Sequence, residues 1–177
     1  HDRAVTAALM ADHHLGYAQP IGGVLAYQNA ISPSGVGYDI ACGNKAIRLD
    51  LPAAEVRPNI STIMTDIWQT LAFGVGRKNK ETVDHALFDE QAWRLKPLAA
   101  LKRLAADQLG SIGSGNHYVD LFVDEAERVW VGVHFGSRGF GHKVASHFIE
   151  AGGGKPNDVY PVVLPVNSNL GQDYLDA

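Results

Sequence analysis

The spacing of apolar side chains predicts two helices in the middle of the chain. In Asn59–Leu71 the apolar residues recur at the interval that places them on one face of an α-helix. These residues are Ile60, Ile63, Met64, Ile67, Trp68 and Leu71. Pro97–Leu109 shows the same pattern, begins with a proline that suits a first helical turn, and stops at Gly110. We expect both apolar faces to be buried in the core.

Alternation of apolar and polar residues predicts strands in four other segments. Val24–Tyr27 is a short strand, and Lys45–Leu51 alternates as a half-buried strand does. Tyr118–Val123 and Val129–Phe135 are strands joined by a short polar connection, which is typical of a hairpin. A glycine-rich turn follows the hairpin, and then a helix that runs to about Ile149, where three closely spaced glycines end it.

Both ends of the chain look cut. His1–Met10 is mixed in character and predicts either a strand or a helix, and it does not begin with methionine. Gly171–Ala177 resembles the first turns of a helix that the chain does not complete. The sequence therefore indicates a part of a longer protein.

Composition narrows the class of protein. The 177 residues amount to one domain by length, with 46% hydrophobic and 19% charged residues, as in ordinary globular chains. No apolar run approaches the roughly 18 residues of a membrane span. A single cysteine forms no internal disulfide, which favours the reducing cytoplasm. The net charge of −4 argues against a broad basic surface for nucleic acid, although not against a local one.

The segment Ile31–Asn44 holds the residues with the most distinctive chemistry. Cys42, the only cysteine, follows Asp39 by three residues, and glycines surround both. A thiolate and a carboxylate held by such a backbone are typical of metal ligands. This mixed pair suits Mn, Zn or Co better than Mg or Ca. The alternative is a small buried cysteine that behaves as a hydrophobe beside a turn aspartate.

Two histidines stand at the open end of the predicted hairpin, His117 before its first strand and His134 within its second. Paired directly opposite, they share a face with their Cβ atoms about 5 Å apart. A slip of one residue places them on opposite faces. A shared metal site therefore predicts the register, or a bulge that corrects it. Together with Asp39 and Cys42, these histidines form a ligand set for two divalent ions, which orient and neutralise phosphate oxygens.

Several other segments leave alternatives open. Asp12–His14 contains either metal ligands or a hydrogen-bonded loop, and the basic loop Gly76–Lys80 is either a solvated turn or a phosphate contact. The glycine-rich turns Gly110–His117 and Gly136–His142 offer backbone N–H groups, an amide and a guanidinium, which are donors that a phosphate or nucleotide needs. The chain lacks a P-loop or a dinucleotide-binding glycine motif, which argues against standard NTPase and Rossmann folds.

Five ordered motifs resemble those of the RtcB family of RNA-splicing ligases. They are Asp12-x-His14-x-Gly16-Tyr17, Pro20-Ile-Gly-Gly23, Gly35-Val-Gly-Tyr-Asp-Ile-x-Cys-Gly43, Gly113-Ser-Gly-Asn-His117 and His134-x-Gly-Ser-Arg-Gly-x-Gly-His142. The third is the most specific. The resemblance implies an α/β (α+β) fold, with mixed and antiparallel sheets flanked by helices around a metal-binding cleft. It also implies that residues 1–177 form the N-terminal part of a single catalytic domain.

The resemblance implies a reaction as well. Members of the family join RNA 3′-phosphate or 2′,3′-cyclic phosphate ends to 5′-hydroxyl ends through a guanylylated histidine, in tRNA splicing or RNA repair. The implied cofactors are GTP and two Mn²⁺ ions, with Zn²⁺ or Co²⁺ as substitutes. The implied partners are RNA with broken or spliced tRNA-like ends and an activator of the archease type. The implied compartment is the cytoplasm.

The resemblance also implies roles for the metal ligands. Asp39, Cys42 and His117 match one manganese site, and Cys42 bridges to a second site that includes His134. The third ligand of the second metal and the guanylylated histidine belong to the family's C-terminal part, after the position that Ala177 matches.

The remaining matches concern the nucleotide. Asn116 matches a residue that contacts the nucleotide phosphate, and Arg138 matches a basic residue of the active site. Asp120 stands where a glutamate that contacts guanine is expected, and its shorter side chain weakens the expected preference for guanine. Two other functions compete with the ligase: a metal-dependent phosphoesterase that uses water as the nucleophile, and a non-catalytic fragment that only binds metal or RNA.

Overall fold

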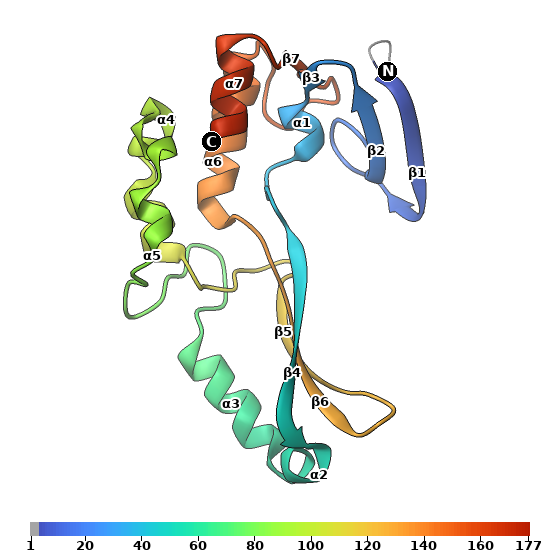
Figure 1. Ribbon diagram of the computed structural model, residues 1–177, viewed down its shortest axis with the longest axis vertical. Helices are drawn as coiled ribbons and strands as arrows, with labels where there is room; N and C mark the ends of the chain where they lie inside the picture. The colour runs from blue at the N-terminus through green and yellow to red at the C-terminus, as the bar shows by residue number, and fades with distance from the viewer. Residues whose placement is uncertain (1–3) are drawn as a thin grey trace. The chain divides into compact units, whose positions relative to one another are not determined.

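The computed structural model describes residues 4–177, which combine strands and helices in the predicted mixed α/β class (Figure 1). The strands are β1 (Ala4–His14), β2 (Ile21–Tyr27), β3 (Ala30–Ile31), β4 (Gly43–Pro52), β5 (Tyr118–Val123), β6 (Arg128–Phe135) and β7 (Leu164–Pro165). The helices are α1 (Pro33–Val36), α2 (Ala53–Val56), α3 (Ile60–Thr70), α4 (Lys96–Ala99), α5 (Lys102–Gln108), α6 (Arg138–Ala151) and α7 (Asn169–Asp176). All the strand pairings of these elements are antiparallel.

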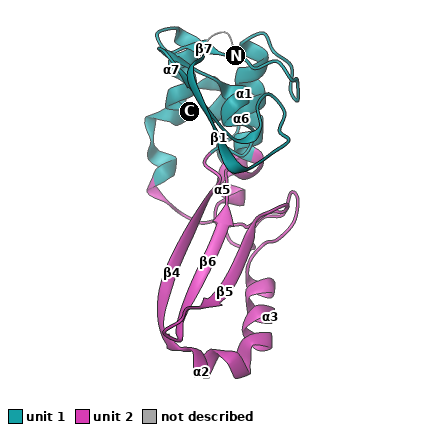
Figure 2. Ribbon diagram, turned by 90° about the vertical axis from the view of Figure 1, so that its right-hand side faces the viewer, with its two compact units in different colours: residues 1–40, 87–102, 140–177 teal, residues 41–86, 103–139 magenta. Residues whose placement is uncertain are grey.

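The chain forms two compact units, shown in teal and magenta in Figure 2. The first unit comprises the residues up to Ile40, together with Leu87–Lys102 and Phe140–Ala177. The second unit comprises Ala41–Ala86 and Arg103–Gly139. The candidate ligands Cys42, His117 and His134 therefore all belong to the second unit.

The first unit is built around one face of α6. Its buried core consists of Leu98, Val144, Phe148, Ile149, Val162, Leu164 and Tyr174. The hairpin β1–β2 and the short pair β3–β7 belong to the same unit. Ser32 joins two of its segments, because its hydroxyl caps the start of α1 at the amide of Gly35 and donates to the carbonyl of Val162 at 2.6 Å. α6 ends before Gly152, as the glycine cluster predicted.

The second unit is a three-stranded sheet in the order β4–β6–β5, accompanied by α2 and α3 (Figure 2). The central strand β6 alternates as predicted. Val129 is fully buried and packs with Ala53 and Val56 of α2, while Leu49, Ile63 and Leu121 pack around them. The opposite face of β6 carries His134, so the sheet separates the packed side of this unit from the side that bears the histidine.

The prediction of a helix in Asn59–Leu71 is confirmed by α3, but the prediction that its apolar face is buried is wrong. No residue of α3 is buried, and Trp68 keeps 67% of its surface exposed while it stacks on Phe73 at 5.1 Å. Ile63 is the residue of α3 that reaches the core of the second unit. Periodicity reports which face of a helix is apolar, but only the surrounding chain decides whether that face is covered.

The single helix predicted for Pro97–Leu109 is instead two short helices, α4 and α5. Leu98 of α4 enters the core of the first unit, whereas Gln108 at the end of α5 is buried in the second. The segment thus passes from one unit to the other, which a continuous helix with one buried face does not do. α6 also starts earlier than predicted, at Arg138 within the glycine-rich turn.

The remaining predictions for secondary structure are largely confirmed. The strands predicted at Val24–Tyr27 and Lys45–Leu51 lie within β2 and β4, and the helix expected at the C-terminal end is α7. Of the segment His1–Met10, residues 4–10 are strand, and the first three residues lie outside the described part of the chain. Within that described part, every helix is too short or too polar to cross a membrane.

The turn between β5 and β6 is organised by the carboxylate of Asp124. One oxygen accepts from the amides of Ala126 and Arg128 at 3.0 Å each. The other accepts from the Arg128 guanidinium at 2.7 Å and from the indole of Trp130 at 2.9 Å. The hydrogen bond from Trp130, followed by those from Arg128 and Ala126, lowers the pKa of Asp124 well below its ordinary value of 3.8.

We expect Asp124→Asn to destabilise the second unit at neutral pH, because the lowered pKa means that the folded state favours the charged carboxylate. That stabilisation is present above the ordinary pKa and is lost as the pH falls toward the lowered one. Thermal unfolding at pH 7 and pH 3 provides the measurement. The melting temperatures of wild type and variant should differ most at pH 7. The gap should be smaller at pH 3, where the carboxylate is largely protonated in the unfolded state but still charged in the folded state. An equal gap at both pH values would contradict the assignment.

Candidate metal centre

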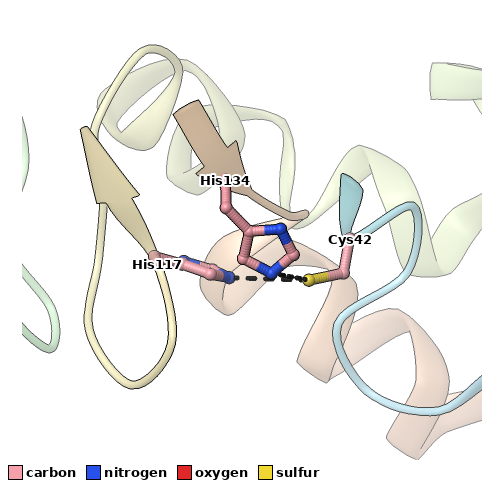
Figure 3. Close-up of side chains that lie close together, drawn as sticks. All are labelled: Cys42, His117 and His134. Carbon is pink, nitrogen blue, oxygen red and sulfur yellow. Dashed lines mark hydrogen bonds between the residues drawn. The ribbon is translucent and has the colours of Figure 1, made fainter. Parts of the chain in front are cut away.

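Three side chains from separate parts of the second unit point toward one another in Figure 3. The ligand atoms of Cys42, His117 and His134 all lie within 4.8 Å of each other. The Cys42 sulfur is 3.0 Å from Nε2 of His134 and 3.9 Å from Nε2 of His117. The convergence predicted for these three residues is therefore found.

Each of the three side chains sits at or next to the same end of the sheet. Cys42 immediately precedes β4, and Ala41 before it has φ +60°, an unusual conformation for a residue with a side chain. His117 immediately precedes β5, and His134 lies one residue from the end of β6. Because β4 and β5 both run antiparallel to β6, the first residues of β4 and β5 lie beside the last residues of β6, at one end of the sheet.

The predicted register between the two histidines is wrong by one residue. Tyr118, not His117, lies directly opposite His134. The slip does not separate the imidazoles, whose ring centroids are 5.5 Å apart, because His117 lies just outside the strand and is not bound by the alternation of the pleat. Its Nδ1 is held instead by the carbonyl of Ile112 in the preceding glycine-rich loop, at 2.8 Å.

Hydrogen bonds orient both imidazoles for metal binding. A carbonyl oxygen only accepts, so the bond to Ile112 places the proton of His117 on Nδ1 and leaves the Nε2 lone pair facing Cys42. Nδ1 of His134 is 2.9 Å from the amide oxygen of Asn44. This bond likewise places the proton of His134 on Nδ1 and leaves its Nε2 lone pair facing Cys42. Histidine ligands of metals in proteins almost always donate their second ring N–H to such an oxygen.

The donor set fits a divalent transition ion. Metal–sulfur and metal–nitrogen bonds of about 2.3 and 2.1 Å place tetrahedral donors roughly 3.5 Å apart, close to the spacing found here. One thiolate and two imidazoles favour a transition ion such as Zn or Co over Mg or Ca. Cys42 is exposed and both histidines are half-buried, so the alternative of a buried structural cysteine is wrong.

The other predicted site residues occupy different positions. Asp39 is half-buried in the turn after α1 and belongs to the first unit, near the end of that unit's N-terminal segment. Among the described residues, the group of three ligands does not include it. Asn116 lies beside the metal group, with its amide nitrogen 3.2 Å from Nε2 of His134. Asp120 is exposed in β5, two residue pairs along from Tyr118 and His134 and on the same face of the sheet as His134. The roles assigned to these residues stay predictions.

Arg138 holds the loop that precedes His117. Its guanidinium donates to the hydroxyl of Ser111 and to the carbonyl of Gly74, both at 3.2 Å. It also lies against the α-carbon of Gly113, which has φ +97° and no room for a side chain. In this structure Arg138 therefore supports the segment whose Ile112 carbonyl orients His117.

The segment Asp12–His14 shows the hydrogen-bonded alternative, although on a strand and not in a loop. Nδ1 of His13 is 2.8 Å from the carbonyl of Met10, and His14 lies within β1. The patterns in the sequence indicate no role for Asn44, Tyr118 or the Ile112 carbonyl. Asn44 directly precedes the predicted strand Lys45–Leu51, and only the structure places it within β4.

We expect Cys42→Ala to abolish most Mn²⁺ binding and Cys42→Ser to retain little, because a hydroxyl is a poor replacement for a thiolate. The loss should exceed the roughly 10- to 100-fold that follows from losing an outer partner of a ligand. Titration calorimetry of wild type and both variants gives the affinities. Equal affinities would mean that Cys42 is not a ligand.

Gly113→Ala should destabilise the second unit more than Gly115→Ala does. Both glycines have positive φ, so each alanine costs about 1–3 kcal/mol of backbone strain. At Gly115 the added carbon meets nothing, whereas at Gly113 it overlaps the guanidinium that Ser111 and Gly74 hold in place. Chemical denaturation measures both differences. Equal losses would show that the Arg138 side chain moves aside freely.

Comparison with known proteins identifies the family. The family model described as "tRNA-splicing ligase RtcB" matches residues 3–102 and 96–177. The chain is 34% identical to the tRNA-splicing ligase RtcB of Thermococcus kodakarensis, over 96% of this chain and 46% of that protein. It is 32% identical to the Aeropyrum pernix protein of the same name, over 96% of this chain and 47% of that one. For the RNA-splicing ligase RtcB of Escherichia coli K12 the identity is 31%, over 81% and 39%.

The chain thus spans about half the length of the Thermococcus kodakarensis and Aeropyrum pernix relatives. The predicted resemblance is confirmed over nearly the whole chain, and the thiolate and imidazole group lies within the matched residues. On this combination of sequence match and site geometry, the chain belongs to the RtcB family.

Proposed function

We propose that the chain forms the metal-binding part of a GTP- and Mn²⁺-dependent RNA ligase. The ligase joins RNA 3′-phosphate or 2′,3′-cyclic phosphate ends to 5′-hydroxyl ends, in tRNA splicing or RNA repair. The observation that carries the proposal is the group of Cys42, His117 and His134 within 4.8 Å, in a chain whose relatives are named RNA-splicing ligases. A thiolate with two oriented imidazoles has no evident use in packing, since Cys42 is exposed.

In this proposal Cys42, His117 and His134 would hold Mn²⁺, with Asp39 as a further ligand, and Cys42 would also serve as a ligand of a second ion. The ions would supply positive charge to phosphate oxygens at the RNA end and on GTP. Zn²⁺ and Co²⁺ substitute for Mn²⁺ at the same donors. The two outer hydrogen bonds, from His117 to Ile112 and from His134 to Asn44, keep both Nε2 atoms available.

The residues around the metal group bind the nucleotide and the RNA end. The amide of Asn116 contacts Nε2 of His134 now, and an ion at that nitrogen would release the amide to donate to a phosphate oxygen. Arg138 contributes a positive charge to the phosphates, and Asp120 accepts from the guanine base on the same sheet face as His134. Asn116 and Arg138 are thus the catalytic residues that this chain contributes, because they contact the reacting phosphates.

The rest of the reaction requires residues from the part of the relatives that this chain does not cover. We place the guanylylated histidine and the remaining ligand of the second metal in the other half of the relatives' length, so that residues 1–177 are the N-terminal part of one catalytic domain. The partners proposed for the whole protein are GTP, RNA with broken or spliced tRNA-like ends, and an activator of the archease type. Its proposed compartment is the cytoplasm.

The 177-residue chain alone should form no covalent adduct with GTP. His117 and His134 are occupied by metal, and none of its other histidines matches the position of the nucleophile. The test is incubation with α-labelled GTP and Mn²⁺, with the E. coli relative as the positive control. Label on this chain would show that the nucleophile is one of its eight histidines and that the proposed division of the domain is wrong.

A chimera tests the proposed activity directly. This chain replaces its matching segment in the E. coli relative, and a second chimera carries Cys42→Ala. The first should retain label and join a 3′-phosphate RNA to a 5′-hydroxyl RNA, and the second should do neither. If the first chimera binds Mn²⁺ and releases phosphate from the RNA end without joining, the phosphoesterase is the correct function. Metal binding with neither reaction would support the non-catalytic alternative.

A further inference from the structure

The metal ligand His134 is surrounded by side chains from both neighbouring strands. β6 is the centre of the sheet, and at His134 it pairs with Asn44 of β4 on one side and Tyr118 of β5 on the other. Residues directly opposite in antiparallel strands have their Cβ atoms about 5 Å apart on the same face. The three side chains therefore form one row across the sheet, and the imidazole is its middle member.

Contacts within this row restrain the imidazole from two directions. Its Nδ1 lies 2.9 Å from the amide oxygen of Asn44, and the ring of Tyr118 stacks on it at 5.8 Å with 20° between the planes. The hydroxyl of Tyr118 donates to the same oxygen of Asn44 at 3.2 Å. An amide oxygen has two lone pairs and accepts both donors at once.

From this arrangement we infer that Asn44 is a positioning residue for the metal site. It holds the proton of His134 on Nδ1 and so directs the Nε2 lone pair toward Cys42, 3.0 Å away. The inference rests on the proposed metal binding but not on RNA ligation. Without the amide oxygen, the imidazole would exchange between its two tautomers, and its ring would turn more freely about a torsion with a broad, two-fold profile.

Asn44 has no comparable role in the fold. It is exposed, it is absent from the buried core of the second unit, and asparagine is unfavourable in strands. A β-branched residue at this position would suit the strand better. The asparagine is therefore explained by the hydrogen bond that it makes to His134, with Tyr118 fixing the orientation of the amide.

The two histidines are held by different kinds of acceptor. Only the acceptor of His134, the side chain of Asn44, can be removed by a substitution. His117 donates to a backbone carbonyl, which no side-chain change removes. His134 depends on a side chain, and Asn44→Val removes the acceptor while keeping or improving strand propensity. Asn44→Asp keeps an acceptor at nearly the same place and makes it a carboxylate, which is an established partner of metal-bound histidines.

The experiment measures Co²⁺ affinity of this chain by titration, following the absorption of the cobalt–thiolate bond, without GTP or RNA. We expect Asn44→Val to weaken Co²⁺ binding about 10- to 100-fold and Asn44→Asp to bind at least as tightly as wild type. Arg48→Val is the matched control, since Arg48 is exposed four residues along β4 and, by alternation, on the same face. It should leave the affinity unchanged.

A second measurement reads the tautomer of His134 directly. The ¹⁵N chemical shifts of the imidazole in the metal-free wild type should show the proton of His134 on Nδ1, and in Asn44→Val they should show a mixture of tautomers. The proposal is overturned if wild type carries that proton on Nε2, or if Asn44→Val binds Co²⁺ as tightly as wild type. If Asn44→Val fails to fold, the ¹⁵N shifts of His134 in wild type and the Co²⁺ affinity of Asn44→Asp still test whether Asn44 positions His134. Absence of Co²⁺ binding in wild type would instead refute the proposed metal site.

Discussion

The pairing of β6 with both β4 and β5 is the interaction on which the site depends. Antiparallel pairing on both edges brings the start of β4 and the start of β5 to the end of β6. Cys42 and His117 each lie one residue before a strand. The backbone hydrogen bonds of the sheet therefore place both residues close to His134, although the three lie far apart in the chain. A change that shifted either pairing by one residue would move every side chain of that strand to the other face.

The two faces of the sheet have different roles: one packs in the core, and the other carries the candidate metal ligand His134. Along β6, alternate residues serve opposite purposes: Val129 is fully buried against α2, whereas His134 faces the metal group. Unfavourable backbone conformations gather around the group, at Ala41 before the cysteine and at Gly113 in the loop before His117. Such conformations cost on the order of 1–3 kcal/mol each where a side chain is present, and the surrounding structure must hold them.

The loop before His117 shows how residues distant in the chain affect the group of Cys42, His117 and His134. Arg138 donates to Ser111 within that loop and to the carbonyl of Gly74, and the carbonyl of Ile112, next to Ser111, sets the tautomer of His117. The resemblance to the family predicts that Arg138 is a basic residue of the active site, and the structure shows that it also supports this loop. Both roles depend on the same guanidinium, so substitution of Arg138 alone cannot separate them.

Local patterns in the sequence determined the elements and the chemistry. Alternation marked the hairpin strands and glycine marked the end of α6, because these features act within a few residues. Cys42 with Asp39, joined by two histidines, indicated a transition metal. Tertiary structure decided the rest. It placed Tyr118 and not His117 opposite His134, divided Pro97–Leu109 between two units, and left Trp68 exposed. Register, burial and the anchoring of His134 by Asn44 all depend on partners distant in the chain, and periodicity along the sequence carries no information about those partners.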